Sequence, residues 1–190
     1  MRLLSKRITS VKRITILGAL LAMALVLAIV ETLLGALIPL PIPGIKLGLA
    51  NIISMFLLCY MGLGSALIVA LLRTFAAALL TGGLSTFLFS APGAMLSILI
   101  MYMVIRYAKR LTIVGVSMTG AAVHNLAQVG MATLVTGEVN LFYYAFVLLI
   151  VGAVSGTITG IVAKMTFHKA AHALNMRAVR GVNYQLTGGG

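Results

Sequence analysis

Acidic side chains are almost absent from this sequence. Its 190 residues include no aspartate and only two glutamates, Glu31 and Glu138. Metal-assisted phosphoryl or prenyl transfer normally needs clustered carboxylates that hold magnesium, so we expect no such catalysis from this chain. A GxxxxGK[ST] phosphate-binding loop is also missing, which argues against ATP hydrolysis by the usual route.

Cysteine and paired metal ligands are scarce as well. The single cysteine, Cys59, lies inside an apolar run, so it has no internal disulfide partner and we expect it to pack as a small hydrophobic side chain. His168 and His172 are four residues apart but have no third ligand near them in sequence. We therefore expect neither a metal site nor a cofactor.

Apolar sequence makes up most of the chain. Hydrophobic residues account for 62% and charged residues for 8%, whereas soluble domains are about half apolar and about a quarter charged. We therefore predict an all-α polytopic membrane protein, in which each helix that crosses the bilayer needs roughly 20 apolar residues. Six transmembrane helices are predicted, near 14–38, 47–61, 65–82, 91–108, 112–136 and 139–164.

The net charge of +12 comes from basic clusters that flank the apolar runs. Of the 14 Lys and Arg residues, five lie within residues 1–13, three within 106–110 and four within 164–180. This distribution follows the positive-inside rule and lacks the base-reading surface of a nucleic-acid-binding protein. We predict a plasma-membrane protein with a cytoplasmic N-terminus (1–13), a membrane domain (14–165) and a basic cytoplasmic tail (166–190).

A proline-rich turn separates the first two predicted helices. Pro41, Pro43 and Gly44 precede Lys46 there, and proline does not fit a helix interior. The charge pattern places this loop outside the cell. It is either a stiff connection or a lid over an outward-facing cavity, and the turn alone favours the connection.

Two charged residues lie within predicted helices at similar depths. With a rise of about 1.5 Å per residue, Glu31 lies roughly 12 Å and Arg73 about 13 Å from the outer ends of their helices. Buried charges in lipid usually face a partner or a cavity. We therefore predict that Glu31 and Arg73 pair.

Neutral polar residues occur in the same half of the predicted bundle. Asn51 and Ser54 share one face near the outer end of the second helix, and His124, Asn125 and Gln128 lie near the middle of the fifth. Any one of them could serve only to hold helices together. Because their depths agree, the group favours an outward-opening ligand site.

Small residues recur at helical spacing on two of the predicted helices. Such stripes let helix backbones approach closely, either within the bundle or against another membrane protein. They are Gly18 and Ala22, Ala24 and Ala28, and Gly152, Gly156 and Gly160.

Four segments together, PGIKLGLANI, LLRTF, FSAPGAMLS and VHNLAQ, resemble a membrane family named Gx transporter or heptaprenyl diphosphate synthase component I. The resemblance covers residues 12–165. That family is similar to the S components of energy-coupling factor (ECF) transporters, six-helix proteins that bind a micronutrient from outside. S components associate with a transmembrane T component and two cytoplasmic ATPases. The resemblance implies that the loop Pro41–Lys46 gates the site and that Ala24 and Ala28 contact the T component.

The leading hypothesis is a substrate-binding membrane subunit for ATP-driven import of a small organic micronutrient, with ATP hydrolysed by partner subunits. Arg73 and Lys46 favour an anionic or carbonyl-rich ligand, and Glu31 balances Arg73. The predicted hydrogen-bonding residues are Asn51, His124, Asn125 and Gln128. The alternatives are an accessory subunit of isoprenoid or quinone biosynthesis and a scaffold in a membrane redox system.

Overall fold

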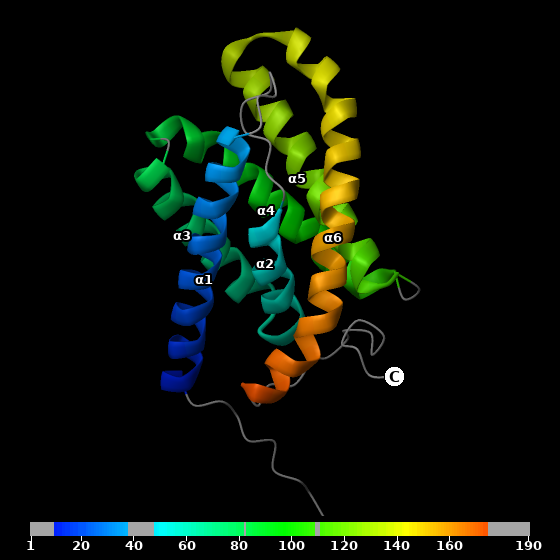
Figure 1. Ribbon diagram of the computed structural model, residues 1–190. Coiled ribbons are helices and arrows are strands. Elements are labelled where there is room, and N and C mark those ends of the chain that lie inside the picture. The colour runs from blue at the N-terminus through cyan, green and yellow to red at the C-terminus, as the bar shows by residue number, and fades with distance from the viewer. Residues whose placement is uncertain (1–9, 38–47, 82, 109–110, 175–190) are drawn as a thin grey trace, which may run out of the picture.

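The computed structural model describes residues 10–37, 48–81, 83–108 and 111–174. Within these ranges the chain forms helices and no strand, which confirms the predicted all-α class. Six α-helices and one 3-10 helix make up the described bundle (Figure 1). Their bounds are α1 Ser10–Leu37, α2 Leu49–Tyr60, α3 Leu63–Thr81, α4 Gly83–Tyr107, α5 Ile113–Thr136, η1 Val139–Tyr143 and α6 Tyr144–Ala173.

Four of these helices, α1, α3, α4 and α6, are long and apolar enough to cross a membrane. Their outward faces are apolar: Leu79, Phe146 and Met165 are each about 70% exposed, as expected for side chains that face lipid. The chain is thus a helical membrane protein. The prediction of six spanning helices, however, needs correction for the second, which is a shorter apolar helix; the fifth is not among these four and stays a prediction.

The second helix, α2, is too short to span the bilayer. Its 12 residues rise about 18 Å, whereas the hydrocarbon core is about 30 Å thick. Gly48 and Gly62, with φ of 77° and 87°, bracket the helix in a left-handed conformation that glycine adopts at little cost. The fifth helix, α5, is long enough but is more polar than the other four because it carries His124, Asn125 and Gln128.

The short helix α2 occupies the centre of the bundle. It contacts all five other α-helices, and ten of its residues are buried. A helix that is apolar on every side is stable only when it is surrounded, and the sequence LANIISMFLLCY has that character. Figure 1 shows α2 in cyan, between α1 on one side and α6 on the other.

Two other helices differ from their predicted bounds. The α4 helix begins at Gly83, so the residues expected to form an outer loop before position 91 are helical, and Pro92 lies inside the helix. The α6 helix continues to Ala173, beyond its predicted end at 164, after the short 3-10 helix η1.

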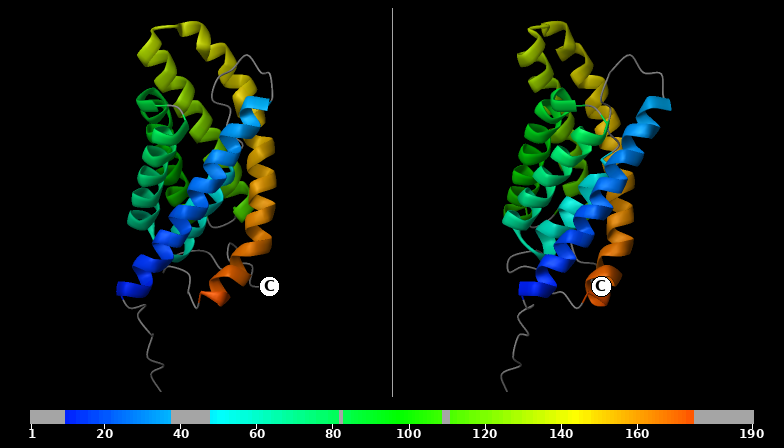
Figure 2. Two further views of the ribbon diagram at one scale, coloured as in Figure 1. Left: turned by 60° about the vertical axis from the view of Figure 1, so that its left-hand side comes forward. Right: turned by 90° about the vertical axis from the view of Figure 1, so that its left-hand side faces the viewer.

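The first and last described helices begin and end at the same end of the bundle (Figure 2). We call it the terminal end, since it holds Ser10 and Ala173, and we call the opposite end, which holds the α5–α6 connection, the far end. Lys12 and Lys169 are exposed near the terminal end, and Glu138 is exposed at the far end. The positive-inside rule therefore predicts that the terminal end faces the cytoplasm.

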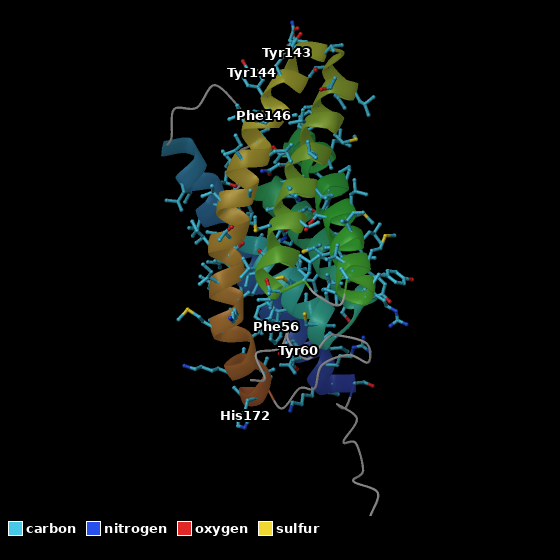
Figure 3. The ribbon with its side chains drawn as sticks, turned by 90° about the vertical axis from the view of Figure 1, so that its right-hand side faces the viewer. Phe56, Tyr60, Tyr143, Tyr144, Phe146 and His172 are labelled. Atoms are coloured by element: carbon cyan, nitrogen blue, oxygen red, sulfur yellow. The ribbon has the colours of Figure 1, made fainter. Side chains whose placement is uncertain are left out.

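Aromatic side chains mark both ends (Figure 3). At the far end, Tyr143 and Phe146 are 82% and 71% exposed, as expected for aromatic residues at a membrane interface. Toward the terminal end, Phe56 packs inside the bundle against Tyr60 and Phe167, with ring centroids 4.7 and 5.2 Å away. These packed rings fill the core of the bundle toward the terminal end.

Candidate functional site

Glu31 on α1 is the first residue of the candidate site. Its side chain is 2% exposed, and its carboxylate accepts a hydrogen bond from the backbone N–H of Gly48, the N-cap residue of α2. The start of α2 therefore lies at the level of Glu31, nearly two turns before α1 ends at Leu37. This corrects the prediction that α2 begins at the outer end of the bundle.

Arg73 reaches the same region from α3. It is 5% exposed, and the negative charge of the Glu31 carboxylate acts on its guanidinium; the pairing predicted from depth stays a prediction. Its Nε is buried without a hydrogen-bond partner. A charge in the membrane interior is tolerated where an opposite charge compensates it, and Glu31 supplies that charge.

Asn51 and Ser54 lie on the first two turns of α2. The backbone N–H of Asn51 donates to the carbonyl of Gly48 at 2.9 Å, while its side-chain Nδ2 is buried without a hydrogen-bond partner. That Nδ2 is 3.5 Å from the position that a Cβ on Gly48 would occupy. Asn51 therefore lies deeper than the outer position predicted for it, because α2 itself starts deeper.

The fifth helix contributes His124, Asn125 and Gln128. His124 and Asn125 are 4% and 3% exposed, and Gln128 is half-buried. The Asn125 Nδ2 donates to the backbone carbonyl of Leu148 on α6 at 3.0 Å. This bond ties α5 to α6, so Asn125 has a structural role.

Glycine lets α4 approach this face of α5. A Cβ on Gly93 would lie 3.1 Å from the His124 carbonyl oxygen, 3.1 Å from Gln128 Cγ and 3.4 Å from His124 Nδ1. Such distances are shorter than ordinary van der Waals contact. Gly93 was not among the residues predicted from sequence, although its place beside Pro92 on an apolar helix marks an unusual position.

These contacts join into one layer that crosses the bundle. Gly48 connects α1 with α2 through Glu31, and its Cβ position is 3.9 Å from Ala121 Cβ on α5, one turn before His124 and Asn125. We call the following six residues the polar layer: Glu31, Asn51, Arg73, His124, Asn125 and Gln128. The printed contacts link Glu31 and Asn51 to the start of α2 and bring Ala121 of α5 beside Gly48, while His124 and Gln128 follow further along α5, beside Gly93 of α4.

A second polar contact lies outside the polar layer and was not predicted. Ser117 and Thr159 share a hydrogen bond of 2.8 Å between α5 and α6. The glycines of α6 make this approach possible, since a Cβ on Gly156 would lie 2.6 Å from Met118 Cα. The glycine stripe on α6 therefore packs within the bundle, one of the two roles considered for it.

The remaining predicted residues fall into two groups. Ala24 and Ala28 are 1% and 9% exposed, so they pack inside this chain and offer little surface to a T component; Gly18, Ala19 and Ala22 on the same helix are exposed. The predicted gate residues lie outside the described part of the chain. They are Pro41, Pro43, Gly44 and Lys46.

The polar layer combines charged and neutral hydrogen-bonding side chains. It offers a guanidinium, a carboxylate, an imidazole and three amides, and within the described ranges no group of three His, Cys, Asp or Glu side chains gathers to hold a metal ion. Hydrogen bonds and charge can orient a polar ligand in such a place.

Comparison with known proteins gives one match. The family model described as heptaprenyl diphosphate synthase component I matches residues 20–166. Neither the curated proteins nor the solved structures contain a significant match to the chain.

Proposed function

We propose, since the chain belongs to the heptaprenyl diphosphate synthase component I family, that it is a membrane subunit which binds a small ligand in the polar layer and leaves catalysis to partner chains. The observation that carries this proposal is the burial of Glu31, Arg73 and His124 inside an apolar bundle. Ionisable groups in the membrane interior are costly and usually serve a function.

The family description favours polyprenyl diphosphate synthesis as the process that this subunit serves. The whole chain contains no aspartate and only two glutamates, so the carboxylates that bind magnesium in prenyl transfer would come from another component. On this proposal the chain is an accessory subunit that recruits the catalytic component to the membrane or provides it with the bound ligand there.

Deletion of the gene tests the accessory role. We expect the amount or the chain length of polyprenyl products to change while small-molecule uptake stays normal, and we expect the tagged full chain to co-purify with a prenyl diphosphate synthase in mild detergent. Normal polyprenyl products in the deletion strain would contradict the proposal. Complementation with an Arg106→Gln variant, altered only at an exposed position, controls for expression.

A second candidate is a substrate-binding subunit for ATP-driven micronutrient import, acting with a transmembrane T component and two cytoplasmic ATPases. The polar layer favours it, because Asn51 precedes Phe56 along α2, and the Phe56 cluster lies toward the end predicted to face the cytoplasm (Figure 3). A ligand that enters from outside the cell would then reach the polar layer before it reaches the Phe56 cluster.

Import predicts a different result in the same deletion strain. Uptake of one micronutrient should fall while polyprenyl products stay normal, and an ATPase-bearing complex should be captured in the presence of ligand. Failure to capture any ATPase under all ligand conditions would remove this candidate.

A further inference from the structure

Two buried donors, one on α2 and one on α3, lack acceptors. The Arg73 Nε and the Asn51 Nδ2 are each buried without a hydrogen-bond partner, in side chains that are 5% and 8% exposed. An unsatisfied buried donor costs about 1–3 kcal/mol, so native proteins retain few of them. Both atoms can only donate, and the group that satisfies them must therefore be an acceptor.

The two donors are linked through Glu31 and the start of α2. Asn51 Nδ2 is 3.5 Å from the Cβ position of Gly48, Gly48 donates its N–H to Glu31, and Glu31 attracts Arg73. The carboxylate of Glu31 is engaged with the start of α2, so its role is to hold that start and to compensate Arg73.

The charges at this junction do not cancel. Arg73 and Glu31 carry opposite unit charges, and the start of α2 adds about half a positive charge from the helix dipole. Adding a ligand with one negative charge leaves a net charge of about −0.5 at the junction, whereas adding a phosphate dianion leaves about −1.5. Excess charge of either sign is costly in this surrounding, so a monoanion fits best.

We propose that Arg73 Nε and Asn51 Nδ2, at the N-terminus of α2, bind the carboxylate of an organic monoanion. This inference rests on the ligand-binding role proposed above and names the chemical class of the ligand. Ala121 of α5 lies beside Gly48, and the polar layer's side chains from that helix are an imidazole and two amides, so the rest of the ligand is apolar or uncharged.

Thermal unfolding of the purified full chain provides the test, and Cys59 provides the signal. Cys59 is the single cysteine and is 1% exposed, so a thiol-reactive fluorophore reports its exposure on unfolding. The probes are hexanoate, hexyl phosphate, the neutral hexanamide and the cationic hexylammonium. We expect hexanoate to raise the midpoint in a concentration-dependent way and hexylammonium to leave it unchanged.

The decisive variant is Arg73→Lys, which keeps the charge that balances Glu31 but lacks Nε. We expect it to fold and to bind hexanoate about 10- to 100-fold more weakly, as loss of a hydrogen bond to a charged group predicts. Asn51→Ala should weaken binding about 10-fold. Arg106→Lys makes the same substitution at an exposed position and should bind as the native chain does.

Three results would overturn the inference. They are equal affinity for hexanoate in Arg73→Lys and the native chain, equal stabilisation by hexanamide and hexanoate, and stabilisation by hexyl phosphate in place of hexanoate. Because this experiment uses the isolated chain, its failure leaves the partner and deletion experiments above as independent tests of the proposed function.

Discussion

Glu31 connects two elements that are distant in sequence. Its carboxylate accepts the N–H of Gly48 on α2 and attracts the guanidinium of Arg73 on α3. Removing either of two interacting buried charges leaves the other uncompensated, so removing the second costs less than removing the first. The pair should therefore show strong non-additivity on mutation.

A double-mutant cycle at Glu31 and Arg73 tests this coupling. We expect Glu31→Ala and Arg73→Ala each to lower the free energy of unfolding by about 3–5 kcal/mol, and the double variant to lose about 1–3 kcal/mol less than the two losses added together. The measurement is unfolding in mild detergent, followed through Cys59. Additive losses would show that the two charges do not interact.

The sequence predicts that these two charges lie at similar depths, but it does not predict the position of Asn51. Helix rise and the positive-inside rule were enough to place Glu31 and Arg73 at one depth. The depth of Asn51 depends on where α2 begins, which is set by the hydrogen bond between Gly48 and Glu31. That contact joins residues 17 apart and leaves no local pattern in the sequence.

The packing of α6 against α5 depends on its glycine stripe. A Cβ on Gly156 would lie 2.6 Å from Met118 Cα, and one on Gly160 would lie 2.7 Å from Val114 Cα. Both neighbours are backbone atoms, which cannot rotate away as a side chain would. An added methyl group at either position must push the two helices apart.

Alanine substitution at Gly156 measures this constraint. We expect Gly156→Ala to lower the free energy of unfolding by about 1–3 kcal/mol through overpacking. Gly130→Ala on α5, where no atom lies within 4 Å of the added methyl group, should be neutral or stabilise by up to about 1 kcal/mol through helix propensity. Equal effects of the two substitutions would refute the close-approach role of Gly156.

The short length of α2 could not be predicted from hydropathy. An apolar run near residues 47–61 fits a spanning helix or a buried core helix equally well, because both environments select the same side chains. The glycines that bracket α2, Gly48 and Gly62, distinguish them through their positive φ. Glycine adopts many other conformations too, so its presence alone did not predict the short helix.

In the whole molecule, the start of α1 and the end of α6 lie at the same end of the bundle (Figure 2). With basic residues near that end and Glu138 at the other, the positive-inside rule predicts a cytoplasmic terminal end and an external far end. This orientation decides which side of the membrane a ligand for the polar layer comes from.

Cysteine labelling in intact cells tests the orientation. Cys59 is buried, so the native chain should not react with a membrane-impermeant maleimide. We expect Glu138→Cys to be labelled in intact cells and Lys169→Cys only after permeabilisation, since these exposed residues lie near opposite ends. The reverse pattern would place the terminal end outside.

The central claim is that the polar layer holds a small molecule, and native mass spectrometry of the intact chain from mild detergent tests it most directly. We predict one bound organic anion per chain, retained in Arg106→Lys and lost in Arg73→Lys. A chain that carries no small molecule under these conditions, or one whose bound molecule is unaffected by Arg73→Lys, would contradict the claim.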